Sequence, residues 1–201
     1  MLSQIKTRER VRQHGEVFTN IREVCAMLDL VGEEAYRIDS TFMEPACGDG
    51  NFLAEILHRK MESVFLLAPE NDADGEFLAT RAFASIYGVD IQMDNVLETR
   101  ERLYNNFFAG FVKHYKHKPS QICIDSIQFI LSQNIQCGNT LTCLTPEGSP
   151  LNITQWHFDY NNGLTINIYD YKEMVETSCN CAPIHTLPRI HYLLLPAIIR
   201  K

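Results

Sequence analysis

A chain of 201 residues, 45% apolar and 21% charged, has the composition of a globular protein of one compact domain. Its net charge of −7 argues against autonomous binding to duplex DNA, which usually requires a basic face. We expect no signal peptide, because the N-terminus is polar, and no membrane span, because the longest apolar run, 192–199, is too short. Seven scattered cysteines favour reduced thiols, so we expect a cytoplasmic protein.

The first two thirds of the chain alternate expected strands and helices, which predicts a parallel sheet with right-handed crossovers. The helices are indicated by apolar residues at three- and four-residue spacing, the strands by short apolar runs, and the loop by acidic and turn-forming residues. In order, we expect a helix at 21–30, a strand at 41–43, a glycine turn at 46–50 with a helix after it, a surface loop at 69–76, a short helix at 77–85, a strand at 86–91, a long helix from 93, a helix at 120–133 and a strand at 135–137.

After residue 141 the pattern changes. The runs 151–158 and 164–169 both alternate apolar and polar residues, and Asn161-Asn162-Gly163 lies between them. Two alternating runs around Asn-Gly predict a β-hairpin. The tail from Ser178 contains three prolines, and we expect it to be irregular.

The most informative segment follows the first expected strand and reads Met43-Glu44-Pro45-Ala46-Cys47-Gly48-Asp49-Gly50-Asn51-Phe52-Leu53. Its two glycines permit positive φ angles and a close approach of the backbone to a ligand. The helix that opens near Asn51 directs unpaired backbone N–H groups at whatever occupies the turn. Glu44 places a carboxylate where it can meet a cation or a hydroxyl group. These features predict a nucleotide-type binding loop.

This segment resembles motif I of the amino-methylating DNA methyltransferases, most closely the adenine-specific proteins of type I and related restriction-modification systems. Their pattern is an acidic residue followed by Pro-Ala-Cys-Gly-x-Gly-Asn-Phe-Leu. The chain departs from it at Glu44, where Asp is usual and the side chain is one methylene shorter. The resemblance implies S-adenosylmethionine as the cofactor.

Three other segments occur in the order that this family requires. His14 to Asn20 resembles an N-terminal Gly-x-Val-Phe-Thr segment that packs on the methionine part of the cofactor. Gly88-Val89-Asp90-Ile91 resembles motif II, whose acidic residue binds the ribose hydroxyls. Cys137 to Leu141 resembles motif III, in which Asp or Asn contacts the adenine, although Asn139 could instead be only a turn residue. The resemblance therefore implies the following cofactor-binding residues: Phe18, Thr19, Glu44, Pro45, Ala46, Cys47, Gly48, Gly50, Asn51, Phe52, Asp90, Ile91 and Asn139.

The resemblance covers about residues 10–142 and implies an α/β fold, a partial Rossmann-like SAM-dependent methyltransferase fold with a C-terminal β-hairpin. In this family the first strand normally pairs with a fourth strand. We expect the hairpin, the apolar tail or another chain to cover the edge left open here. The expected parts are a helical segment at 1–35, a cofactor-binding core at 36–142, and a hairpin with an irregular tail at 143–201.

The family's catalytic motif is Asp or Asn, then Pro-Pro, then Tyr or Phe. It is absent, because no two of the eight prolines are adjacent. In the family its carbonyl groups accept hydrogen bonds from the target amine and its ring stacks on the flipped base. The catalytic residues are therefore unknown, and we expect the isolated chain not to methylate DNA. We expect no metal site, because Cys179-x-Cys181 lacks the usual zinc-knuckle spacing.

Three hypotheses for the function remain open. The first is a modification subunit of a restriction-modification system that acts on DNA through a partner subunit, which would supply the missing catalytic half. The second is a catalytically inactive SAM-binding module that regulates or scaffolds such a complex. The third is an interaction protein that binds no cofactor. In each case we expect a partner chain or a homo-oligomer.

Overall fold

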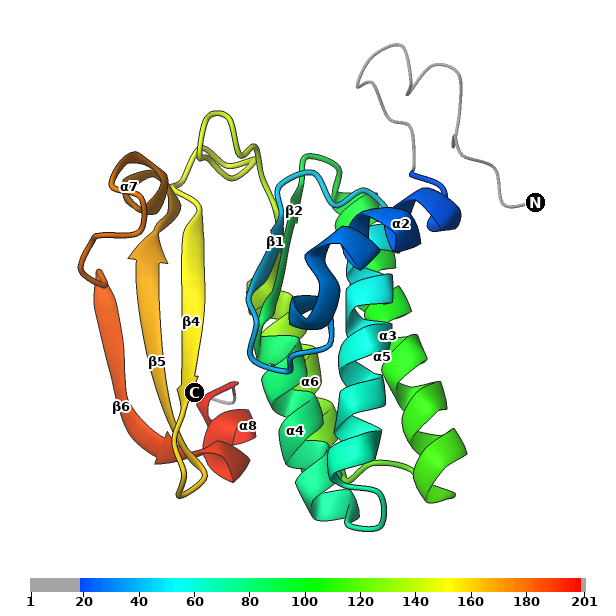
Figure 1. The fold of residues 1–201 in the computed structure, drawn as a ribbon. Helices are drawn as coiled ribbons and strands as arrows, with labels where there is room; N and C mark the ends of the chain where they lie inside the picture. Colours follow the sequence, from blue (N-terminus) through cyan, green and yellow to red (C-terminus); the bar gives the residue numbers. More distant parts are fainter. Residues whose placement is uncertain (1–18, 200–201) are drawn as a thin grey trace.

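The computed structural model describes residues 19–199 as a mixed α/β protein with two separate three-stranded sheets, one parallel and one antiparallel (Figure 1). The elements in chain order are α2 (Ile21–Val31), η1 (Gly32–Ala35), β1 (Phe42–Glu44), α3 (Asn51–Leu67), α4 (Asp72–Ala84), β2 (Ile86–Asp90), α5 (Met93–Tyr115), α6 (Gln121–Asn134), β3 (Ile135–Cys137), β4 (Asn152–Phe158), β5 (Gly163–Asp170), α7 (Tyr171–Glu176), β6 (His185–His191), η2 (Tyr192–Leu194) and α8 (Leu195–Ile199).

The parallel sheet has the strand order β1-β2-β3, so the prediction of three parallel strands is confirmed. Helices α3 and α5 pack against each other and against β2 on one face of this sheet (Figure 1). Gly88 permits the close packing, because a Cβ atom at this position would lie 2.7 Å from Cδ1 of Leu53. All five residues of β2 are buried, as is usual for a central strand of a parallel sheet.

Helix α4 begins earlier than the sequence pattern predicts, and the expectation of a loop through residue 76 is wrong from Asp72 onwards. The side chain of Asn71 accepts a hydrogen bond from the backbone N–H of Asp74 and so caps the helix. Asp72 and Asp74 lie in the first turn, where negative charge interacts favourably with the helix dipole. Asn71, Asp72 and Asp74, which are typical of a surface loop, are therefore also the residues that start the helix.

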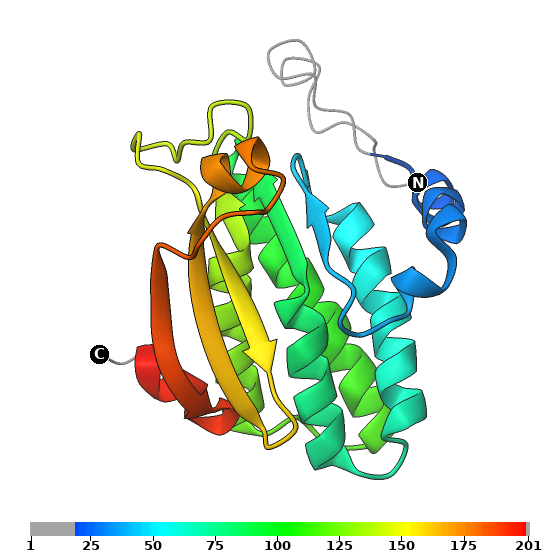
Figure 2. The ribbon, with the colours of Figure 1, turned by 60° about the vertical axis from the view of Figure 1, so that its left-hand side comes forward.

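The antiparallel sheet has the order β4-β5-β6, which confirms the predicted hairpin between β4 and β5. Aromatic side chains of β4 attach this sheet to helices α4 and α6. Trp156 on β4 donates its indole N–H to Oδ1 of Asn134 at 2.9 Å, and the rings of Phe158 and Phe77 meet edge to face. Viewed with the hairpin side turned forward, the three antiparallel strands lie in front of the parallel sheet (Figure 2).

The expectation of an irregular tail holds for residues 178–184 but is wrong from His185 onwards, where β6, η2 and α8 are all regular. Strand β6 pairs with β5, and the register shifts by one residue between the pairs Leu164–Ile190 and Ile166–Leu187. Pro188 lies at this irregularity, where an edge strand tolerates a residue without a backbone N–H. Tyr192 and Leu195 then bury their side chains, and α8 packs on α6.

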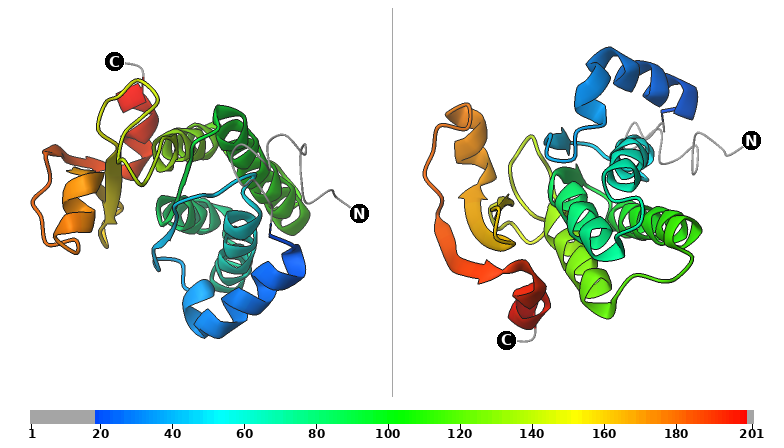
Figure 3. Two further views of the ribbon diagram at one scale, coloured as in Figure 1. Left: turned by 90° about the horizontal axis from the view of Figure 1, so that it is seen from above. Right: turned by 60° about the horizontal axis from the view of Figure 1, so that its bottom comes forward.

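The tail therefore does not pair with β1. Among residues 19–199, β1 is hydrogen-bonded as a strand only to β2, and its outer edge has no strand partner. The antiparallel sheet and α8 lie on the side of the helical layer opposite α2 (Figure 3). No helix in this part of the chain has both the length and the apolar character needed to cross a membrane.

Candidate functional site

A cavity of about 450 Å³ opens at the carboxyl ends of the three parallel strands, and we call it the carboxyl-end cavity. This is the position at which open α/β sheets usually bind their ligands. The loops that follow β1, β2 and β3 form its walls. The cavity is lined by Thr19, Glu44, Pro45, Ala46, Cys47, Gly48, Asp49, Asn51, Phe52, Asp90, Ile91, Gln92, Asn95, Gly138, Asn139, Thr140 and Leu141.

The structure brings together every predicted binding residue except two. Phe18 lies outside the described residues, and Gly50, the N-cap of α3, does not line the cavity. Residues that are distant in sequence meet here because the parallel strands all end at the same edge. Thr140 shows this directly, since its hydroxyl donates to the backbone oxygen of Pro45 at 3.2 Å. That these residues bind S-adenosylmethionine stays a prediction.

The loop after β1 depends on its two glycines. Gly48 and Gly50 have φ angles of +55° and +82°, which side chains other than glycine rarely adopt. A Cβ atom on Gly50 would also lie 2.8 Å from both Cγ2 and Oγ1 of Thr99. Thr99 fixes the loop from below, because its hydroxyl donates to the backbone oxygen of Gly48 at 3.0 Å.

Helix α3 starts immediately after this loop with Gly50 as its N-cap, a residue without a side chain to cap the first turn. The Asp49 carboxylate accepts a hydrogen bond from the backbone N–H of Asn51, and the following N–H groups of that turn remain for a ligand. Together with the helix dipole they favour a negatively charged or strongly hydrogen-bond-accepting group. Asn51 and Phe52 in this first turn both line the cavity.

Arg102 on α5 holds the same loop from the other side, and sequence reasoning missed it. Its guanidinium forms an ion pair with Asp49 at 2.9 Å and also contacts the side-chain oxygen of Asn51. Burial raises the pKa of Asp49, and Arg102 opposes this by stabilising the carboxylate. Asp49, the residue between the two glycines, thus connects the loop to α5. The sequence does not indicate this ion pair, because it depends on how α5 packs beside the loop.

Asp90 connects the first two loops. Its carboxylate accepts hydrogen bonds from the backbone N–H of Gly48 at 2.9 Å, from that of Gln92 at 2.8 Å and from Nδ2 of Asn95 at 3.1 Å. A carboxylate has about four acceptor positions, so three protein donors leave room for one ligand hydroxyl. Asp90 is therefore both a structural cross-link and a candidate ligand acceptor.

Asn139 has a structural role in the loop after β3. Its Oδ1 accepts hydrogen bonds from the backbone N–H groups of Leu141 at 2.9 Å and Thr142 at 3.3 Å. This is the turn arrangement that the sequence left open as an alternative. The side chain nevertheless lines the cavity, and within residues 19–199 no hydrogen bond involves its Nδ2. A turn role and a ligand contact are therefore compatible.

The remaining walls include an acidic side chain, a thiol and two exposed apolar side chains. Burial raises the pKa of Glu44, although a weak hydrogen bond from the backbone N–H of Ala46 opposes this rise. Burial also raises the pKa of the Cys47 thiol to about 12, which keeps it neutral. Ile91 and Leu141 expose 54% and 94% of their surface at the opening. Such exposed apolar side chains offer a surface for a flat aromatic group.

The basic segment 113–118 lies far from this cavity. It begins in the last turn of α5, which ends at Tyr115, whereas the start of that helix at Met93 adjoins the cavity loops. At 1.5 Å per residue, the two ends of the helix between Met93 and Lys113 are about 30 Å apart. These cations therefore cannot neutralise phosphates at the cavity, whose lining includes Glu44, Asp49 and Asp90.

Comparison of the chain with models of protein families, with curated proteins and with solved structures found no match. In residues 19–199, no group of three or more His, Cys, Asp or Glu side chains is arranged to hold a metal ion. The site must therefore be interpreted from its own geometry.

Proposed function

We propose that the chain binds S-adenosylmethionine in the carboxyl-end cavity. In this proposal it is the cofactor-binding part of a DNA adenine-N6 methyltransferase-like protein, with a partial Rossmann-like fold. The observation that carries the proposal is the convergence of the glycine loop, Asp90 and the Asn139 loop on one cavity. Its volume of about 450 Å³ lies within the range of about 300–1,000 Å³ that small-molecule sites occupy.

The residues present fit the parts of this ligand. Asp90 has acceptor capacity for a ribose hydroxyl, and Ile91 and Leu141 provide apolar surface for adenine. Glu44 lines the cavity and would pair with the ammonium group, and N–H groups of the first turn of α3 would bind the carboxylate. When bound, S-adenosylmethionine supplies an electrophilic methyl group. The chain's own residues would bind and orient it.

The catalytic step is assigned to residues outside this chain. The adenine amine is a poor nucleophile, and the chain lacks the Pro-Pro motif that positions acceptors around it. The acidic side chains that line the cavity, and the distance of the basic segment 113–118 from it, also disfavour DNA binding by the chain alone. A modification subunit that works with a partner therefore fits better than a self-sufficient enzyme. An inactive SAM-binding module stays the alternative.

The proposal is tested by calorimetric titration of the purified chain with S-adenosylhomocysteine, which is chemically stable. We expect saturable binding with one site per chain. Asp90→Asn should weaken it by about 1–3 kcal/mol, which corresponds to about 5- to 150-fold, because a ribose hydroxyl loses its charged acceptor. Glu101→Gln is the matched control, since Glu101 is an exposed carboxylate on the neighbouring helix α5.

Asp90 also supports the loop, so each variant is first checked by circular dichroism and thermal unfolding. Ile91→Asp provides a second variant at an exposed position, where the fold does not depend on the side chain. It should weaken binding by placing a charge against the adenine surface. Absence of any heat with wild-type protein at millimolar ligand would refute the proposal. A partner chain that carries Asn-Pro-Pro-Tyr and restores methyl transfer to DNA would favour the modification subunit over the inactive module.

A further inference from the structure

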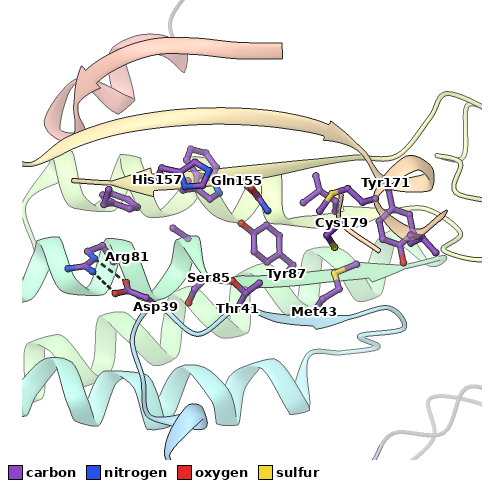
Figure 4. Close-up of a pocket in the computed structure, with 16 residues that line it drawn as sticks. Asp39, Thr41, Met43, Arg81, Ser85, Tyr87, Gln155, His157, Tyr171 and Cys179 are labelled. Carbon is purple, nitrogen blue, oxygen red and sulfur yellow. Dashed lines mark hydrogen bonds and ion pairs between the residues drawn. The ribbon is translucent and has the colours of Figure 1, made fainter. Parts of the chain in front are cut away.

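A second cavity, of about 670 Å³, lies between the parallel sheet and strand β4, and we call it the intersheet cavity (Figure 4). Its floor is the face of β1 and β2 that α3 and α5 do not cover, with Met43 and Tyr87. The end of α4 closes it near Arg81, and α7 closes it near Tyr171. None of these groups belongs to the carboxyl-end cavity.

Strand β4 presents its edge, and not one of its faces, to this cavity. Successive side chains of a strand point to opposite faces, so a face would contribute only alternate residues. Gln155, Trp156, His157 and Phe158 all line the cavity. Four consecutive residues can do so only if the edge of the strand borders it. β4 is the outer strand of its sheet, because β5 is its only strand partner among residues 19–199.

The hydrogen bonds identify which backbone groups of β4 point outward. In an antiparallel pair, alternate residues turn both their N–H and their C=O toward the partner strand. Asp159 donates its N–H to Gly163 across the hairpin, so the odd-numbered residues face β5. The oxygen of Thr154 instead accepts from the hydroxyl of Tyr87 at 2.9 Å. The N–H and C=O groups of Trp156 and Phe158 therefore also point away from β5.

These outward groups determine the chemistry of an occupant. A row of backbone donors and acceptors at strand spacing matches another polypeptide backbone in extended form, and a lipid or a simple aromatic molecule would leave it unpaired. The remaining surface suits side chains, since Met43, Ile153 and Met174 are apolar. A parallel sheet is normally covered on both faces, yet the three residues of β1 are only half-buried.

We propose that the intersheet cavity binds an extended polypeptide segment of another protein, which adds to the free edge of β4 at Trp156 and Phe158. Alternate side chains of the segment enter the apolar space over Met43 and Tyr87. The segment is short, because the oxygen of Thr154 is already bonded to Tyr87, and the outward groups of Trp156 and Phe158 lie only about 7 Å apart at 3.3 Å per residue. The proposal does not depend on which ligand occupies the carboxyl-end cavity.

The test begins with selection of random peptides of about eight residues on the full chain, with an unrelated protein as the comparison bait. We expect enriched sequences with apolar residues at alternate positions. Binding of the synthetic peptides is then measured by fluorescence anisotropy for the variants Phe158→Pro and Phe158→Ala. Both remove the ring, but only proline removes the outward N–H, which an edge strand tolerates. Phe158→Pro should therefore bind at least about tenfold more weakly than Phe158→Ala.

Backbone amide hydrogen exchange of the wild-type chain tests the proposal even if the proline variant does not fold. In the wild-type chain the amides of Trp156 and Phe158 should exchange faster than those of Gln155 and His157, and saturating peptide should protect them. Failure to enrich any peptide over the comparison bait would overturn the proposal. Equal affinity of the two Phe158 variants, or protection confined to other elements, would do so as well. Thermal stabilisation by decanoate without peptide enrichment would assign the cavity to small apolar ligands instead.

Discussion

Replacing Gly50 with alanine tests the geometry of the loop after β1 most directly. Gly50 has a φ angle of +82°, and for an L-residue this left-handed conformation costs about 1–2 kcal/mol. The new methyl group would lie 2.8 Å from Cγ2 and Oγ1 of Thr99, a contact that forces the loop or α5 to shift. Overpacking of this kind costs a further 1–3 kcal/mol, so we expect a total loss of about 2–5 kcal/mol.

Gly148→Ala is the matched control. Gly148 has nearly the same φ angle, +81°, but no atom lies within 4 Å of the position that the new methyl group would take. It should lose only the conformational part, about 1–2 kcal/mol. Urea unfolding followed by circular dichroism gives both values, provided that the slope of the free energy with urea is the same in all variants.

The variant Gly50→Ala, Thr99→Ala completes the cycle. Thr99→Ala alone should destabilise the chain, because it removes the hydroxyl that bonds to the backbone oxygen of Gly48. In the double variant the two 2.8 Å contacts are removed and only the 3.1 Å contact with Cβ of residue 99 remains, so the combined loss should be smaller than the sum of the single losses. Equal destabilisation by Gly50→Ala and Gly148→Ala, or strict additivity with Thr99→Ala, would refute the reasoning.

Three further predictions concern buried groups. Lys60→Met should lower the free energy of unfolding by about 3–5 kcal/mol in urea, because three backbone oxygens and one hydroxyl lie within hydrogen-bond distance of Nζ of Lys60 and would lose its N–H donors. The exposed control Lys118→Met should lower it by less than about 0.5 kcal/mol. Affinity for S-adenosylhomocysteine should fall as the pH is lowered through the raised pKa of Glu44, where the carboxylate becomes neutral, and calorimetry on Glu44→Gln should show no such fall. Iodoacetamide at pH 8 should alkylate exposed Cys179 and spare Cys47, whose pKa is raised to about 12, as peptide mass spectrometry would show.

The strands and long helices could be predicted from the sequence because their signals are local. Each of β1, β2 and β3 is a short apolar run next to a turn or a helix, and the hairpin is marked by alternation around Asn161-Asn162-Gly163. The start of α4 could not be predicted in this way, because the same acidic residues serve equally in a loop and in a first helical turn. Strand β6 was missed because its proline argues against a strand unless the edge position and the bulge are known.

In the candidate site, too, contiguous segments could be predicted from the sequence, and contacts made by tertiary packing could not. The residues of the glycine loop could be found because the loop is contiguous in sequence and its spacing is distinctive. Arg102 and Thr99 could not, because their contact with the loop depends on how α5 packs beside α3. Asn139 was identified as a binding residue or a turn residue, and the structure places it in the turn and on the cavity wall together. Packing partners from another helix leave no local pattern in the sequence.

Under the proposed function, the opening of the carboxyl-end cavity also indicates where a partner would have to act. Glu44, Asp49 and Asp90 line the cavity, and Arg102 is already paired with Asp49, so phosphates there would need further cations within about 10 Å at moderate salt. The chain's own basic segment is about 30 Å away along α5. A partner that supplies both the cations and the acceptors for the adenine amine would therefore approach the carboxyl ends of the parallel strands, and the intersheet cavity would remain free for its own peptide.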